Sequence, residues 1–171
     1  MQVQEFMLPP VECPSRFIAV MGRAASGVSV VTTDGIAGRF GVTVSAISSV
    51  SAEPPLILAC VNRKSPIVTA IDANGVFCVN LLAVRQQPIA DTFAGRPRSG
   101  RPYDFGCADW LVGETGAPVL PEAAASFECS LEAAHDAGTH RIFIGRVLKA
   151  LGGEAEPLVY SARAYRRIVE L

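Results

Sequence analysis

The chain has 171 residues, of which 50% are hydrophobic and 18% are charged, and its net charge is −1. This length suits one domain with a sizeable core, and the scattered, nearly balanced charges do not indicate a nucleic-acid partner. No apolar run approaches the roughly 18 residues of a membrane span, and residues 1–12 carry acids and prolines where a signal peptide needs a cationic start. We therefore expect a cytoplasmic protein without a membrane partner, and the high apolar fraction favours a homodimer.

Side chains with reactive groups are few in this sequence. There are five cysteines without C-x-x-C spacing, and this odd number argues against a disulfide framework or a zinc site. Only two histidines are present, and the motifs of dinucleotide folds, P-loops, hydrolase nucleophile elbows and zinc proteases are missing. We expect no metal site. An enzyme whose chemistry belongs to a bound organic cofactor needs few reactive side chains of its own, so this class fits best.

The first half of the domain is expected to alternate short strands with turns. We expect residues 1–13 to form an irregular arm and residues 14–171 to form one domain. Apolar residues at helical spacing predict a short helix from Pro14 to just before Gly27. The β-branched run over residues 28–33 and the following Asp-Gly pair predict a strand and a hairpin. Further strands are expected over residues 36–44, 56–61 and 76–82.

The segment after the strand over residues 56–61 has the clearest helix signals in the sequence. Ser65 is a good N-cap, and Pro66 suits the first helical position. Asn74 and Gly75 form a good terminator, so a helix is predicted over residues 67–73.

The second half is expected to add one helix, one long loop and three strands. The expected elements are a helix over residues 86–94, a loop over 95–106, strands over 126–134, 141–151 and 158–160, and a turn over 135–140. About six strands with two or three short helices, and no β–α alternation, predict a mainly β (α+β) fold. We interpret it as an antiparallel barrel with helical additions.

Two segments have the chemistry of a cofactor site. Arg63, Lys64 and Ser65 stand directly before the predicted helix, where free N–H groups and the helix dipole favour a phosphate. An ordinary solvated helix start is an equally good interpretation of these residues alone. Residues 43–51 offer hydroxyls and backbone N–H groups suited to a neutral planar heterocycle, although a serine-rich turn has the same composition. Both segments flank the strand over residues 56–61, so one ligand with a ring and a phosphate can span them.

Several stretches of sequence match patterns of a known family. Residues 41–55 read GVTVSAISSVSAEPP and are similar to the flavin-binding pattern GxTxSSxxSVSxxPP. Residues 138–147 read GTHRIFIGRV and are similar to GDHTIFIGEV. Shorter matches are GVSVVTT at 27–33, CVNRKS at 60–65, DTFAG at 91–95, and PLVY with a later YR within 157–166. Together these segments, over residues 17–168, resemble the flavin reductase-like family of FMN-binding split barrels.

The resemblance implies a fold, a cofactor and a set of contact residues. It implies an antiparallel Greek-key split β-barrel with two or three short flanking helices, which dimerises with flavin at the interface. The implied contacts to the ring and ribityl chain are Thr43, Val44, Ser45, Ala46, Ser48 and Ser49. The implied phosphate-side and turn residues are Cys60, Asn62, Arg63, Lys64, Ser65, Phe93 and Gly95. His140 takes the position of a family histidine near the nicotinamide.

The resemblance also implies an activity. The expected enzyme transfers hydride from NADH or NADPH to FMN or FAD and supplies reduced flavin to a separate flavin-dependent monooxygenase. His140 either positions the nicotinamide or transfers a proton; its sequence context does not separate these roles. The chain departs from the family at Ala46, where many relatives have serine, and at Thr139, where an acid often precedes the histidine.

Two other functions are compatible with such a barrel. One is a non-catalytic protein that holds flavin or haem, for which the His140 stretch has no purpose. The other is an oxidase of a phosphorylated amine such as pyridoxamine phosphate, which needs a second basic cluster. Loop residues Arg96, Arg98 and Arg101 are the candidates for that cluster or for a dinucleotide pyrophosphate, but they are also typical solvated charges. Tyr103 and Phe105 suit ring stacking and core packing equally.

Overall fold

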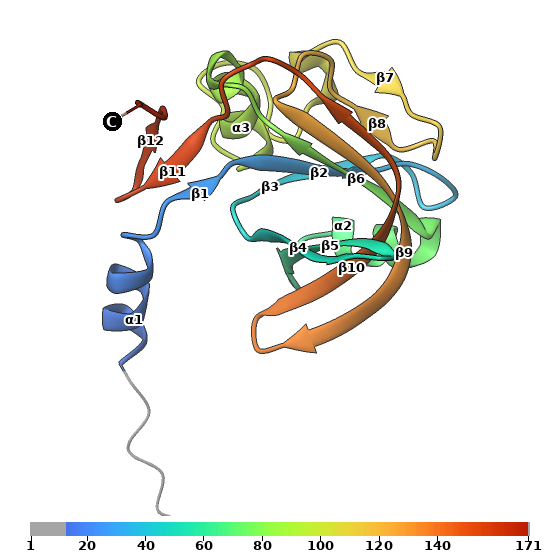
Figure 1. The fold of residues 1–171 in the computed structure, drawn as a ribbon, viewed down its shortest axis with the longest axis horizontal. Helices are drawn as coiled ribbons and strands as arrows, with labels where there is room; N and C mark the ends of the chain where they lie inside the picture. The colour runs from blue at the N-terminus through green and yellow to red at the C-terminus, as the bar shows by residue number, and fades with distance from the viewer. Residues whose placement is uncertain (1–12, 171) are drawn as a thin grey trace, which may run out of the picture.

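The computed structural model describes residues 13–170, and its centre is one curved antiparallel sheet of seven strands (Figure 1). In spatial order the strands are β3 (Phe40–Val44), β2 (Ser29–Thr33), β6 (Val76–Leu81), β9 (Ala125–Ala137), β10 (His140–Gly152), β5 (Pro55–Asn62) and β4 (Ile47–Ala52). The long strands β9 and β10 bend so that the β3–β2 side of the sheet faces the β5–β4 side (Figure 1). The predicted mainly β, antiparallel fold is confirmed.

Smaller elements surround this sheet. Three α-helices are present in the described residues, α1 (Pro14–Met21), α2 (Ile67–Asn74) and α3 (Gln87–Phe93), with 3-10 turns η1 (Val84–Gln86) and η2 (Phe105–Cys107). Strands β1 (Ser26–Gly27), β11 (Val159–Ser161) and β12 (Ala164–Arg166) form a second sheet, and β7 (Leu111–Val112) pairs with β8 (Pro118–Val119). The expected arm at residues 1–13 lies outside the described residues apart from Cys13. None of the helices in the described part has the length and apolar character needed to span a bilayer.

The two larger apolar clusters among the described residues pack on the sheet and stabilise it. The cluster inside the curl contains buried side chains from β2, β5, β6, β10 and α2, including Val31, Val61, Phe77, Phe143 and Ile71. The second cluster joins the sheet to α3 through Phe93, Leu82 and Leu158. Along β5, alternate residues Ile57, Ala59 and Val61 are buried. Because side chains of a strand alternate between its faces, Cys60 and Asn62 point to the side opposite this core.

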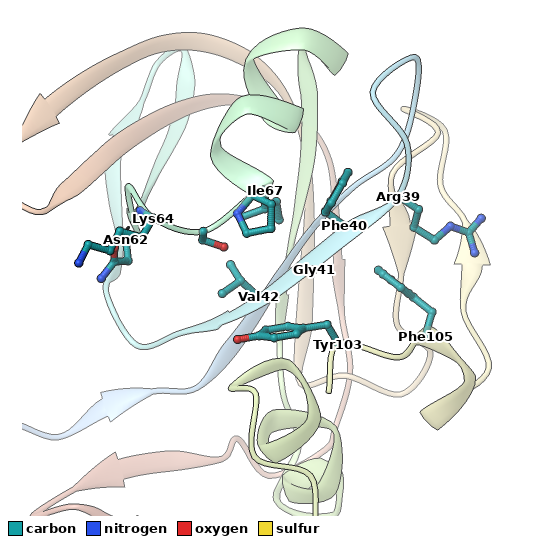
Figure 2. A pocket seen from close by; sticks show the side chains of 11 residues that line it. Arg39, Phe40, Gly41, Val42, Asn62, Lys64, Ile67, Tyr103 and Phe105 are labelled. Carbon is teal, nitrogen blue, oxygen red and sulfur yellow. Dashed lines mark hydrogen bonds between the residues drawn. The ribbon is translucent and has the colours of Figure 1, made fainter. Parts of the chain in front are cut away.

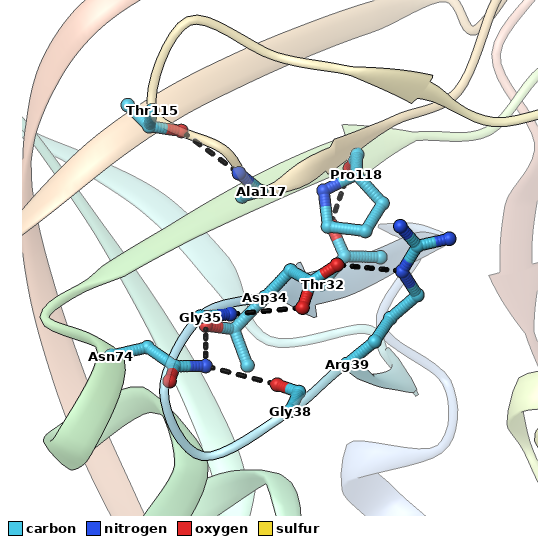
Figure 3. Close-up of polar contacts among 10 residues, drawn as sticks. Thr32, Asp34, Gly35, Gly38, Arg39, Asn74, Thr115, Ala117 and Pro118 are labelled. Atoms are coloured by element: carbon cyan, nitrogen blue, oxygen red, sulfur yellow. Dashed lines mark hydrogen bonds and ion pairs between the residues drawn. The ribbon is translucent and has the colours of Figure 1, made fainter.

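Several predicted boundaries were wrong, and each error has a local cause. The return strand begins at Phe40 rather than at residue 36, because the side chain of Asn74 holds residues 34–39 as a loop. Its amide donates to the Gly38 carbonyl at 3.1 Å (Figure 3), and its oxygen accepts from the Ala37 N–H at 2.8 Å. Strands β9 and β10 run to Ala137 and His140, so the expected turn over residues 135–140 shrinks to two residues. Gly138, with φ +57°, permits this tight connection.

A buried polar side chain, Asn80 on β6, fixes the segment around β8 against the sheet. Its amide donates to the carbonyls of Val30, at 3.2 Å, and Pro118, at 3.3 Å. Its oxygen accepts from the Leu120 N–H at 2.8 Å and from the Ser126 hydroxyl at 3.1 Å. The hydroxyl of Thr32 also donates to the Pro118 carbonyl, at 2.6 Å (Figure 3). A single asparagine therefore satisfies polar groups from three parts of the chain, around Val30, Pro118 and Ser126.

We expect Asn80→Ala to lower the free energy of unfolding by about 3 kcal/mol, because several buried polar groups lose their partners at once. Urea unfolding followed by circular dichroism measures the change. Leu111→Ala, on an exposed position of β7, is the control and should change stability by less than about 0.5 kcal/mol. Equal effects of the two substitutions would contradict the role given to Asn80.

Candidate functional site

The connection between β5 and α2 is a tight turn organised by Asn62. The Lys64 N–H donates to the Asn62 side-chain oxygen at 3.0 Å, and the Ser65 N–H donates to the Asn62 carbonyl at 2.9 Å. The helix follows at once and ends at Gly75, whose φ of +69° gives the expected left-handed cap. This turn places Lys64 and Ser65 at the positive end of the helix dipole.

The hydroxyl of Ser65 does not cap α2, contrary to prediction. The residue at the N-cap position is Pro66, and no side-chain hydrogen bond closes this end of the helix. Among residues 13–170 the Ser65 hydroxyl has no hydrogen-bond partner, since Ser65 uses only its backbone N–H and carbonyl. The hydroxyl is therefore available to a ligand.

The two neighbouring cations of this turn have different surroundings. The guanidinium of Arg63 lies 3.3 Å from the Asp136 carboxylate and donates to the Gly138 carbonyl at 3.4 Å, so it is tied to the β9–β10 hairpin. Arg141 extends the same cluster, with ion pairs to Asp136 at 2.9 Å and to Asp72 on α2 at 3.2 Å. Lys64 makes no ion pair with any described residue. The uncompensated positive charge of the turn is therefore on Lys64.

Lys64 and Ser65 open into a cavity of about 540 Å³ between the β5–α2 turn, β3 and the loop before η2. Its lining residues are Arg39, Phe40, Gly41, Val42, Asn62, Lys64, Ser65, Pro66, Ile67, Tyr103 and Phe105. Figure 2 shows Asn62 and Lys64 at one end, Arg39 and Phe105 at the other, and Val42 and Tyr103 between them. The sequence did not indicate that Arg39, just before β3, and Phe40 and Val42 of β3 belong to a site, because the residue pattern of this segment indicates only packing.

His140 is adjacent to the same turn through strand pairing. In the β5–β10 ladder His140 is the direct partner of Asn62, and Ile142 is the partner of Cys60. Direct cross-strand partners share a face of the sheet, so His140 lies on the side that carries Asn62 and Cys60. The Arg63 N–H donates to the Thr139 carbonyl at 3.0 Å, and a 2.9 Å hydrogen bond joins the Thr139 hydroxyl to Nδ1 of His140. Nε2 of this ring has no partner within residues 13–170.

The serine-rich segment reaches the turn through the backbone. The Cys60 N–H donates to the Ala46 carbonyl at 2.9 Å, which places Ala46 beside the end of β5. Ser45, Ala46, Ser48 and Ser49 are exposed. The residues over 47–52 form the edge strand β4, which pairs only with β5 within the described sheet. Burial raises the pKa of the Cys60 thiol, so this side chain stays neutral near pH 7.

Other predicted contact residues have structural partners. The Thr43 hydroxyl donates to the Ala90 carbonyl of α3 at 2.8 Å, and Val44 is part of the core. Phe93 is fully buried, with its ring centroid 4.9 Å from that of Phe105, and leaves no surface for a ligand. Gly95 has φ +76° and lies against the Tyr103 hydroxyl.

Two of the loop arginines are compensated by neighbouring carboxylates. Arg98 pairs with Asp91 at 3.2 Å, and Arg101 lies 3.6 Å from Asp104. Arg96 lines a separate small cavity of about 170 Å³ with Ser45 and Tyr165 among its walls. Neither arrangement forms a second uncompensated basic cluster of the kind that a phosphorylated-amine oxidase needs.

The donors gathered here fit a ligand that has both a phosphate and a neutral ring. One cation, one unpartnered hydroxyl and a helix N-terminus suit a phosphate. The exposed hydroxyls and backbone beside Ala46 and Cys60 carry no charge and suit the carbonyls and nitrogens of a heterocycle. The predicted residues from three separate segments, around Ala46, Asn62 and His140, therefore meet at one side of the sheet.

Comparison with known proteins agrees with this arrangement. A family model described as "Flavin reductase like domain" matches residues 21–169. The chain belongs to the flavin reductase-like family. The FMN reductase (NADH) RutF of Variovorax paradoxus (strain S110) is 43% identical over 162 residues, which cover 94% of this chain and 88% of that protein. Its counterpart in Agrobacterium fabrum is 44% identical over 149 residues, with 85% and 83% covered.

Solved structures of flavin reductases have the same fold. Flavin reductase PheA2 aligns with a TM-score of 0.84 at 29% identity, covering 93% of this chain and all of its own. BorF, the flavin reductase component of a bacterial two-component tryptophan halogenase, aligns with a TM-score of 0.82 at 36% identity, with 92% and 99% covered. The NADH:FAD oxidoreductase SgcE6 of Streptomyces globisporus C-1027, in complex with NAD and FAD fragments, gives 0.83 at 31% identity, with 94% and 98% covered.

We expect Asp136→Asn to loosen the contact between the β5–α2 turn and the β9–β10 hairpin, because it removes the ion pairs to Arg63 and Arg141. Hydrogen exchange of a peptide covering residues 62–66 should become roughly three- to fivefold faster, the size expected for exposed ion pairs. Glu132→Gln is the matched control, since it breaks the 2.9 Å ion pair to Arg146 on the same hairpin. Equal acceleration in both variants would show that Asp136 has no special role at this contact.

Proposed function

We propose that this chain is an NAD(P)H:flavin oxidoreductase that reduces FMN or FAD, with NADH as the favoured donor, and releases the reduced flavin to a separate monooxygenase. The observation that supports the proposal is the pairing of Asn62 with His140, which puts the β5–α2 turn and a free imidazole nitrogen on one face. The RutF relatives are named as NADH-dependent FMN reductases, and BorF serves a separate halogenase.

In this proposal each predicted segment has one task. Lys64 and Ser65 hold the phosphate, while backbone and hydroxyl groups around Ser45, Ala46 and Ser48 hold the ring. When bound, the flavin supplies the hydride-accepting chemistry. The protein's own contribution is mainly positioning, because correct stacking of donor and acceptor removes much of the barrier to transfer. Nε2 of His140, with the ring held at Nδ1 by Thr139, either hydrogen-bonds the nicotinamide carboxamide or donates a proton.

We also propose a cytoplasmic homodimer. Helix α1 projects from the body of the chain (Figure 1), and its side chains Phe17, Ile18, Val20 and Met21 are all exposed. A cavity of about 480 Å³ beside β4, lined by Ile47, Leu56 and Phe127 among others, adds apolar surface. A second copy would cover both areas. Light scattering should give twice the mass of one chain, and a monomer at micromolar concentration would contradict this part of the proposal.

The activity is tested by following loss of NADH absorbance with purified protein and added FMN or FAD. We expect turnover that depends on flavin, with NADPH as a parallel donor. Tight flavin binding without nicotinamide oxidation would support the non-catalytic carrier instead. No oxidation with either donor and either flavin would overturn the enzymatic proposal.

Lys64→Ala should raise the KM for FMN by about tenfold, because a charge-assisted contact to the phosphate is lost. The kcat at saturating FMN should change little, since Lys64 does not touch the reacting atoms. Steady-state kinetics measures both values. Arg101→Ala removes an exposed, ion-paired loop cation and is the control. If both variants raised the KM for FMN equally, the effect of Lys64 would come from the net charge of the protein and not from a contact to the phosphate.

His140→Gln should lower kcat/KM for NADH by roughly a hundredfold if the imidazole transfers a proton, and by about tenfold if it only positions the donor. The dissociation constant for FMN, measured by calorimetry, should stay within about twofold of the wild-type value, since this substitution leaves the β5–α2 turn with Lys64 and Ser65 unchanged. The pH dependence of kcat separates the two roles. A variant with wild-type kinetics would remove His140 from the mechanism.

A further inference from the structure

The cavity beside Lys64 is larger than a phosphate requires, and its far end is aromatic. Its volume of about 540 Å³ is in the range of sites for whole small molecules or cofactors. Phe105 and Arg39 line the end away from Asn62 and Lys64, and Tyr103 lies between the two ends (Figure 2). The activity proposed above uses only the end at Lys64 and Ser65, so the aromatic end has no assigned ligand.

Tyr103 is exposed but firmly held. Tyr103 is 53% exposed, so part of its aromatic ring is open to a ligand. Its φ is +59°, a left-handed conformation that is uncommon for a bulky residue and clusters at functional sites. Its N–H donates to the Thr92 carbonyl at 3.0 Å. The Tyr103 hydroxyl lies so close to Gly95 that an added Cβ would be 2.6 Å from it. The ring is therefore fixed as a wall of the cavity.

The charge of this end is balanced, unlike that of the Lys64 end. The Arg39 guanidinium pairs with Asp34 at 2.7 Å and lies 5.6 Å from the centroid of the Phe105 ring. Phe105 is in turn supported by Trp110 at 5.2 Å between ring centroids. A second phosphate would find no free cation among the described residues at this end. A flat, uncharged heteroaromatic ring would find an exposed aromatic face, and such stacking is favourable for any base.

We propose that Tyr103 and the Phe105–Arg39 pair form a subsite for an adenine ring, reached from the phosphate held at Lys64 and Ser65. This inference rests on the proposed function. Adenine is present in both FAD and NADH. The aromatic end and the Lys64 end belong to one cavity, and this favours FAD, whose flavin phosphate is proposed to lie at Lys64. The subsite would make FAD bind more tightly than FMN, because only FAD extends beyond the first phosphate.

The test is calorimetric titration of the full chain with FMN and with FAD, together with the KM for NADH at saturating FMN. Tyr103→Asn removes the ring and keeps a residue that tolerates positive φ. Tyr103→Phe keeps the ring, and Leu111→Asn replaces an exposed side chain that does not line the cavity. We expect Tyr103→Asn to weaken FAD binding about tenfold and FMN binding by less than twofold, with Tyr103→Phe and Leu111→Asn like the wild type.

Each outcome of these measurements either supports or overturns the adenine subsite. An increase only in the KM for NADH would support an adenine subsite and assign it to the nicotinamide dinucleotide rather than to FAD. Three results would overturn the inference. The first is an equal loss of FMN and FAD binding in Tyr103→Asn, and the second is no loss of flavin binding together with an unchanged KM for NADH. The third is wild-type protein that binds FAD no more tightly than FMN, with no change in the KM for NADH in Tyr103→Asn. In these cases FMN still binds and the proposed function stands. Failure of both flavins to bind wild-type protein would overturn the function and the inference together.

Discussion

The register between β5 and β10 is the constraint on which the site depends. It sets Asn62 directly opposite His140, and the Arg63 N–H to Thr139 carbonyl bond continues the contact beyond the last pair. A shift of one strand by one residue would turn its side chains to the other face of the sheet and would separate Asn62 from His140. The large apolar residues Val61 and Phe143, buried from these same strands, resist such a shift. Core packing therefore also fixes the geometry of the site.

The two adjacent cations of the β5–α2 turn have different roles, one in holding the structure and one in binding, because only one of them has a carboxylate partner. Arg63 is neutralised by Asp136 and anchors the hairpin, whereas Lys64 keeps an uncompensated charge at the start of α2. An already paired cation would have to give up its partner to hold a phosphate, and an unpaired one has no such cost. Carboxylates also balance Arg39, Arg98 and Arg101 around the long loop. Among the described residues that line the main cavity, the contrast in charge is thus between the Lys64 end and the aromatic end.

Sequence reasoning succeeded where the signal was local. The run at residues 56–61, the helix ending at Gly75 and the mainly β class all follow from side-chain periodicity and turn chemistry. Strand β4 was missed because its serines lack apolar alternation and its position depends on pairing with β5. The side-chain partner of Arg63, Asp136, is 73 positions away in the chain, and no propensity reports such a contact. The free hydroxyl of Ser65 was also missed, since a serine before Pro66 has the composition of a cap. The family resemblance, not the spacing, indicated His140.

The central claim is that the turn at Asn62–Ser65 binds the phosphate of a flavin whose ring rests beside Cys60. Titration of the wild-type protein with riboflavin and with FMN, at low and at high salt, tests this most directly, because the two ligands differ only by the phosphate. We predict that FMN binds at least about tenfold more tightly than riboflavin at low salt and that added salt narrows the difference. Equal affinities at every salt concentration would contradict the account.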